Sequence, residues 1–338
     1  MRRTSPARQR LAGAFLAVVM SAGASVCSAQ TPDAGSSSAI LALMSEVGTE
    51  RTQVLLVIDP ERMRVQPAAS SVLSLPLLVG PFVAPRVVSP VRRFTLILVP
   101  VGGRWEAIGV TEGDRDLTAR FERLHGDAAD TAGRHRLYEL APSAPWRVAL
   151  LDRHRIVEGP ETALRAALEP EAPGSTSQGR LFEVAHRLVA LPDTRSPATL
   201  FYFSPEEDAD LVQIISDLDW IWGTGLRAGV APYQMVLRML GSMRGARADV
   251  WEAGDELAAR IVLVAPSGAA AKRSQMALSA GRQLGLVAAA AAVRTGSMRQ
   301  ADAETLAGVL ESMRSHVEEE CVHVELRMQA ADLLGPEN

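Results

Sequence analysis

The sequence predicts an α+β protein with two lobes of antiparallel sheet, each with helices packed on one face. Two β-hairpins carry this prediction: residues 94–111 turn at Gly102-Gly103, and residues 248–264 turn at Gly254-Asp255. A helix is expected after each hairpin, so residues 94–124 and 248–278 share one order of elements over equal lengths. Few identical residues align between the two segments, so the predicted duplication concerns topology and not sequence.

The first 29 residues have the layout of a secretory signal peptide. Four arginines precede an apolar run from Leu11 to about Ala24, and small residues follow as far as Ala29. This run is too short to span a bilayer. We therefore expect cleavage after Ala29, a location in the periplasm or outside the cell, and no transmembrane span in the mature chain. The alternative is a lipid anchor on Cys27, but Val26 stands where lipoprotein signals carry a small residue.

Charge and cysteine content restrict the partners and the source of stability. The formal net charge is −4, and it becomes −8 without the signal, which carries four arginines and no acid. A net acidic chain without a basic cluster is a poor candidate for binding nucleic acid or an anionic membrane. Cleavage also leaves Cys321 as the only cysteine. Because one thiol cannot form an intramolecular disulfide, stability must come from the core.

The first predicted lobe covers residues 30–170. Its first helix is expected to be capped within Ser36 to Ser38 and to bury Ile40, Leu43, Met44 and Val47. Residues 52–58 are apolar throughout, which predicts a strand buried on both sides. Further expected elements are a helix after Asp114 or Asp116, strands at 135–140, 146–151 and 155–157, and a helix from Pro160 to Leu168.

A linker at residues 171–180 is predicted to join the second lobe, residues 181–338. The segment Glu169 to Gly179 is rich in Pro, Gly, Ser and Glu, which is typical of a linker. In the second lobe, Ser204 opens a capping box, and a helix is expected to follow Ser267 and to extend through Leu286. Strands followed by a short helix are expected in residues 316–334.

One segment of the first lobe resembles known proteins. The sequence WRVALLDRHRIVEGPETALRAAL, residues 146–168, is similar to segments of a broad set of exported bacterial α+β proteins with repeated hairpin–helix units. The resemblance implies ferredoxin-like halves. It brings no catalytic motif, so it implies an architecture and not a chemistry.

Metal-ligand residue types gather near the C-terminus. Within a strand, alternate residues share a face, so Glu319, Cys321, His323 and Glu325 would project together while Val322 and the other alternate residues face the core. Cys321 and His323 could supply two ligands to zinc or copper. The alternative interpretation is the solvated face of an amphipathic strand, because no CxxC or HExxH pattern completes the set.

Two apolar segments are candidate partner surfaces. Residues 72–88 are dense in apolar side chains but are interrupted by three prolines, which break a helix. Three alternatives remain for this segment: it packs inside the protein, it is an exposed patch that docks another envelope protein or a lipid surface, or it spans a membrane. The second segment, 219–233, carries aromatic residues. The residues chosen for these surfaces are Leu77, Leu78, Phe82, Trp220, Trp222 and Tyr233.

These observations favour an exported, non-catalytic binding or structural module of the cell envelope or periplasm, without a cofactor. The mature chain contains no G-x-S-x-G nucleophile motif, and its glycine-rich stretch at 223–229 does not follow a strand as a dinucleotide site requires. The alternative is a metal-dependent or hydrolytic enzyme with an unfamiliar motif.

Overall fold

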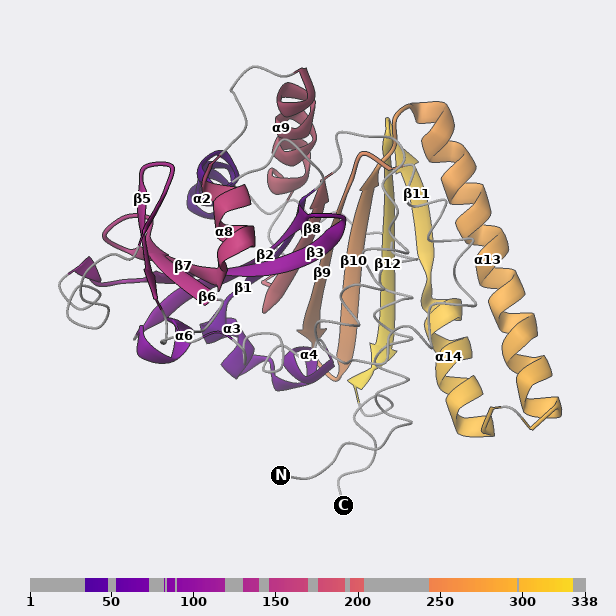
Figure 1. Ribbon diagram of the computed structural model, residues 1–338. Coiled ribbons are helices and arrows are strands. Elements are labelled where there is room, and N and C mark those ends of the chain that lie inside the picture. Colours follow the sequence, from indigo (N-terminus) through magenta and orange to yellow (C-terminus); the bar gives the residue numbers. More distant parts are fainter. Residues whose placement is uncertain are drawn as a thin grey trace.

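Figure 1 shows the computed structural model of the chain. The residues that it describes are 34–47, 53–72, 82, 84–88, 90–118, 130–139, 146–169, 176–191, 195–203, 243–296 and 298–330. The helix expected from Ser204 lies outside these residues, as does most of the helix expected after Asp116.

The described strands form one antiparallel sheet of twelve strands, in the order β11-β12-β10-β9-β8-β1-β2-β3-β7-β6-β5-β4 (Figure 1). The predicted hairpins are confirmed as β2–β3 and β9–β10. The strands are β1 (Gln53–Ile58), β2 (Val91–Val101), β3 (Arg104–Gly113), β4 (Asp130–Ala132), β5 (His135–Glu139), β6 (Trp146–Leu150), β7 (Arg155–Pro160), β8 (Ala198–Phe203), β9 (Gly245–Ala253), β10 (Glu256–Val264), β11 (Arg314–Glu318) and β12 (Cys321–Gln329).

The two halves of the chain meet at the centre of this sheet. β1 pairs with β2 on one side and with β8 on the other, with Leu55 opposite Phe201. The sheet therefore runs without interruption through both predicted lobes. Helix α9 (Thr176–Val189) begins inside the segment assigned to the linker.

Helices cover both faces of the sheet, so the expectation of helices on one face is wrong. One face, here called the α9 face, packs against α2 (Ala34–Glu46), α8 (Glu161–Leu168) and α9. The other, the α13 face, packs against α4 (Pro67–Val72), α13 (Gly268–Arg294) and α14 (Gln300–Ser312). The short helices α3 (Pro60–Val65) and α6 (Ala84–Val87) complete the described helices.

The reason for two covered faces lies in the central strands. In β2, Phe94, Leu96 and Leu98 join the core on the α13 face, while Ile97 and Val99 join the core on the α9 face. A strand that is apolar on both sides must be covered on both sides to remove this surface from water. The same pattern in β1 confirms the strand predicted to be buried on both sides.

Helix boundaries follow local capping where the side chains can supply it. The Ser267 hydroxyl accepts a hydrogen bond from the Ala270 amide at 3.2 Å, so α13 begins as predicted and continues past Leu286 to Arg294. Helix α2 instead begins at Ala34, before the expected serine cap, although its predicted apolar face is buried.

Candidate metal centre

The β11–β12 hairpin, at one edge of the sheet, places its polar residues on the α9 face. Val322, Val324 and Leu326 of β12 are buried in the core of the α13 face. Because side chains alternate along a strand, Cys321, His323 and Glu325 project to the opposite face. The residues of β11 opposite them are Glu318, His316 and Arg314, respectively.

The turn of this hairpin consists of Glu319 and Glu320, and contacts from two other elements hold it. The Ala265 amide donates a hydrogen bond to the Glu320 carbonyl at 2.8 Å. Arg187 of α9 forms an ion pair with the Glu320 carboxylate at 3.0 Å. Glu319 has a φ of 52°, a left-handed conformation that residues other than glycine seldom adopt. The turn thus interrupts the continuous strand that the sequence predicted over Glu319.

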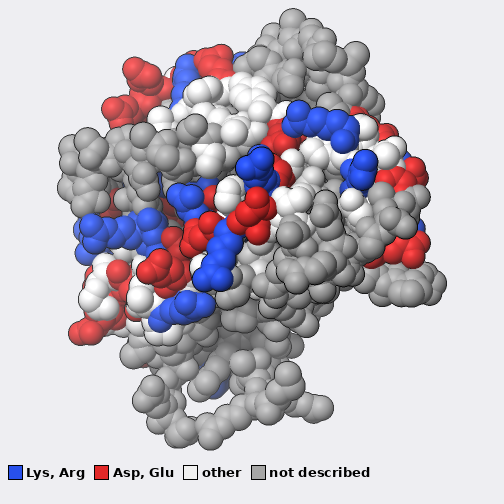
Figure 2. All heavy atoms as spheres, turned by 90° about the vertical axis from the view of Figure 1, so that its left-hand side faces the viewer, with Lys and Arg blue, Asp and Glu red and all other residues white. Residues whose placement is uncertain are grey.

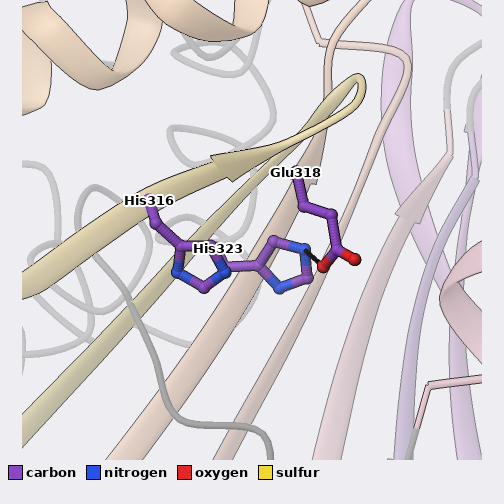
Figure 3. Close-up of side chains that lie close together, drawn as sticks. All are labelled: His316, Glu318 and His323. Carbon is purple, nitrogen blue, oxygen red and sulfur yellow. Dashed lines mark ion pairs between the residues drawn. The ribbon is translucent and has the colours of Figure 1, made fainter.

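His316 and His323 face each other across the hairpin (Figure 3). They are direct partners in the β11–β12 register, and their rings stack with centroids 4.7 Å apart and an angle of 10° between the planes. Cross-strand pairing fixes the spacing of the two backbones, so this proximity is built into the sheet and does not depend on a loop.

Glu318 completes a cluster of three metal-ligand residue types. Its Oε2 lies 3.6 Å from Nε2 of His323 (Figure 3). One ligand atom from each of His316, Glu318 and His323 can be chosen so that all three lie within 4.8 Å of one another. Imidazole nitrogen and carboxylate oxygen bind zinc at roughly 2.0–2.2 Å, so the stacked rings and the carboxylate would have to turn toward a shared ion.

The electrostatic environment favours neutral imidazole at this position. Burial lowers the pKa of His323 below its usual 6.5, and the neighbouring His316 lowers it further, against the opposing effect of Glu318. Neutral imidazole is the form that binds a metal ion. Cys321 differs, because burial and the three nearby glutamates raise the pKa of its thiol above 9.0. The protonated thiol is a poor metal ligand.

A row of polar residues crosses five strands beside this cluster. The row is set by register and runs through Thr199, Asp249, Arg260, Glu325 and Arg314. Asp249 is fully buried, and it accepts hydrogen bonds from the Thr199 hydroxyl at 2.8 Å and from Arg260 at 3.0 Å.

Arg247 links this row to helix α9. Its guanidinium donates to the Asp249 carboxylate at 3.1 Å and to the carbonyls of Leu188 and Leu191 at 3.1 Å and 2.9 Å. The Leu188 carbonyl lies in the last turn of α9 and that of Leu191 just beyond it, where a cation is favoured by the helix dipole. The buried ion pair therefore fixes α9 to the sheet.

The structure brings together only part of the predicted metal set. Cys321, His323 and Glu325 share one face, whereas Glu319 lies in the turn. The clustered residues His316 and Glu318 were not among those chosen, although they fall in the same ten-residue segment. Recognising a hairpin turn at 319–320 would have placed His316 opposite His323.

Of the six predicted partner-surface residues, the structure describes only Phe82. Phe82 is 1% exposed, and its ring packs against Phe94 and Trp146 with centroid distances of 5.2 Å and 5.4 Å. This side chain is not available to a partner. The other five predicted surface residues lie outside the described residues: Leu77, Leu78, Trp220, Trp222 and Tyr233.

Charges of both signs are interspersed at the far end of the sheet (Figure 2). In the β4–β7 region, Arg147 pairs with Glu161 at 3.1 Å, and Arg165 pairs with Asp130, Glu161 and Glu169. Because Arg147 and Arg165 each have acidic neighbours, this part of the described surface carries both signs and offers no broad cationic area for a polyanion.

The fold and the site define an α+β protein built on one antiparallel sheet with a histidine–carboxylate cluster at its edge. No family model and no curated protein matches the chain. Crystal forms I and III of TP0453 are similar to it, with TM-scores of 0.36 and 0.39 and 11% sequence identity. Each match covers 86% of this chain and 94–95% of TP0453. Both scores are below 0.5, so this similarity is distant.

Proposed function

We propose that this chain is an exported binding protein that holds a divalent transition-metal ion between His316, Glu318 and His323. The proposal rests on the observation that ligand atoms of these three side chains lie within 4.8 Å of one another on one hairpin. Imidazole with carboxylate suits zinc, copper and nickel better than magnesium or calcium, which prefer ligand sets made of oxygen alone. Zinc is therefore the first ion to test.

Three features of the site support binding near neutral pH. His323 is largely neutral there, so the metal does not have to displace its proton. The backbone pairing of β11 with β12 holds the two imidazoles opposite each other without a metal. Glu318 is mostly exposed, at 67%, so its carboxylate can turn toward the imidazoles without disturbing the core.

Export is supported by the sequence of the first 29 residues, with its arginines, apolar run and small residues. We propose a periplasmic or extracellular location, with a lipid anchor on Cys27 as the alternative. The symmetric positions of β2–β3 beside β1 and of β9–β10 beside β8 support a duplicated hairpin unit, with ferredoxin-like halves joined at β1 and β8.

Zinc titration of the purified chain by calorimetry, near neutral pH, tests the metal site. We expect one zinc ion per chain, and we expect His323→Gln to weaken binding by more than about 100-fold, since even the loss of an outer-shell partner costs 10–100-fold. Glu318→Gln should also weaken binding. Glu319→Gln is the matched control, because this neighbouring glutamate lies in the turn outside the cluster, and it should bind zinc as the unchanged protein does.

Equal zinc affinity in the unchanged protein and in His323→Gln would contradict the proposal. Equal losses of zinc affinity in Glu318→Gln and Glu319→Gln would also contradict the proposal, because they would indicate a general effect of negative charge.

The same ligand set favours a second candidate, a zinc-dependent hydrolase. Three protein ligands leave one position of a tetrahedral zinc ion open, which is the arrangement of catalytic zinc sites, where bound water becomes a nucleophile. Hydrolysis of an activated ester by the zinc-loaded chain, with loss of activity in His323→Gln, would favour the enzyme. Zinc binding without any hydrolysis would favour the binding protein.

A further inference from the structure

Helix α13 carries an apolar face that no described element covers. By length and composition, this 27-residue helix could cross a membrane: its most apolar 18-residue window has a mean hydropathy of 1.4, yet only 11% of that window is buried. Met276, Leu284 and Val287 are 71%, 66% and 64% exposed. They account for three of the four large hydrophobic residues that the described part of the chain exposes, the fourth being Val65 of α3.

These residues lie along one side of the helix. Met276, Ala280, Leu284, Val287 and Ala291 follow at intervals of three and four residues, which places them on one face of an α-helix. The buried residues of α13 include Ala271, Ser274 and Leu278, which lie on the opposite side. Arg282 is also turned away, since it donates a hydrogen bond to the Leu310 carbonyl of α14 at 2.7 Å.

The charge of α13 differs from that of the whole chain. The helix contains Lys272, Arg273, Arg282 and Arg294 and no acidic residue, whereas the chain as a whole has a net charge of −4. On the exposed face, Arg273 lies one turn before Met276, and Arg294 lies one turn after Ala291. The apolar face is therefore bounded by a cation at each end.

From this arrangement we propose that α13 docks on an anionic lipid surface, lying flat with its exposed face among the acyl chains. An interfacial helix combines an apolar face with cations that reach the phosphate groups, and α13 has both. Its other face packs against the sheet and α14, which fits a helix that lies on the membrane and does not cross it. The distance from Arg273 to Arg294 is about 31 Å at the helical rise, so the two cations contact separate headgroups.

Charge argues against a second copy of the chain as the occupant. If two α13 helices paired antiparallel through their exposed faces, Arg273 of one copy would lie beside Arg294 of the other at both ends. Like charges in contact oppose such pairing, and no acidic residue of α13 could neutralise them. A lipid phosphate surface neutralises both cations.

Co-sedimentation of the full chain with lipid vesicles tests this surface. We expect binding to vesicles of phosphatidylcholine mixed with phosphatidylglycerol, weakened by salt, and little binding to phosphatidylcholine alone. The double variant Leu284→Asp, Val287→Asp should lose at least about tenfold in partitioning, because both exposed apolar side chains are replaced by anions. Val65→Asp, which changes an equally exposed residue on α3, is the matched control and should bind as the unchanged protein does.

The cations require a separate variant. Arg273→Ser with Arg294→Ser should lower partitioning into the anionic vesicles by up to about 30-fold, as each cation near the surface contributes about 1 kcal/mol. The proposal is overturned if the Leu284→Asp, Val287→Asp variant binds like the unchanged protein or if the anionic vesicles bind nothing. The proposal is also overturned if light scattering shows that the unchanged protein self-associates and that this double variant does not. The exposed face of α13 would then bind a second copy of the chain.

Discussion

At the β4–β7 end of the sheet, arginine pairs with acids at the surface, whereas in the β8–β12 half an ion pair lies beneath the surface. Arg165 and Asp130 have side chains 31% and 55% exposed, while Arg247 and Asp249 are 6% and 0% exposed. The same residue types therefore serve different purposes. At the first end they remain in water, and in the second half they position α9 and lie beside the histidine cluster.

The largest difference between the two regions should appear on removing one carboxylate. Asp249→Ala leaves Arg247 and Arg260 without their shared buried partner, so we expect a loss of about 3–5 kcal/mol in the free energy of unfolding. Asp130→Ala removes an exposed partner of Arg165 and should leave stability unchanged within error. Urea unfolding of both variants gives the comparison, and equal losses would show that burial does not separate the two regions.

Glycine positions provide a second comparison, with effects of opposite sign. A Cβ at Gly109 of β3 would lie 2.5 Å from Phe82 Cδ1, so Gly109→Ala should cost about 1–3 kcal/mol by overpacking. A Cβ at Gly281 of α13 would meet nothing within 4 Å, and Gly281→Ala should add about 0.5–1 kcal/mol through helix propensity. In thermal unfolding, the midpoint should be lower for Gly109→Ala and higher for Gly281→Ala than for the unchanged protein. A lower midpoint for Gly281→Ala would contradict the open environment described for α13.

The smallest effect should be the pH dependence that His323 contributes. Its pKa is lower in the folded protein than the usual 6.5, so the unfolded chain binds the proton more readily. The contribution of His323 to the free energy of unfolding is therefore fully present above about pH 6.5. It is lost as the pH falls below that value toward the pKa of the folded protein. Without metal, the unfolding midpoint of the unchanged protein should fall relative to that of His323→Gln as the pH is lowered through this range. A difference that is constant with pH would rule out this contribution.

Much of the local structure was predictable from the sequence. The glycine-containing turns predicted both hairpins, Ser267 predicted the start of α13, and the alternation after Cys321 predicted which side chains of β12 face the core. Each of these depends on interactions between residues close in sequence. Elements without such signals, including α4, α14 and β8, were not predicted, and α3 was missed although Asp59 caps its first turn.

The candidate metal site was only partly predictable, for a physical reason. The turn that places His316 opposite His323 consists of two glutamates, and Glu319 takes up its left-handed conformation without glycine or asparagine. Hairpin turns are usually recognised by such residues. Without that signal, the segment has the pattern of one strand, which groups Glu319 with His323 and leaves out His316.

The pairing of β1 with β8 has a consequence for the order in which the protein can fold. β2 begins at Val91 and can pair with β1 early, but β8 begins only at Ala198. A chain that emerges N-terminus first therefore keeps one hydrogen-bonding edge of an apolar strand open until the second half follows. Contacts between residues so far apart in sequence form slowly, because a long loop must close before they contribute. For this sheet, the rate at which the second half is delivered sets how long its central strand remains able to pair with other chains.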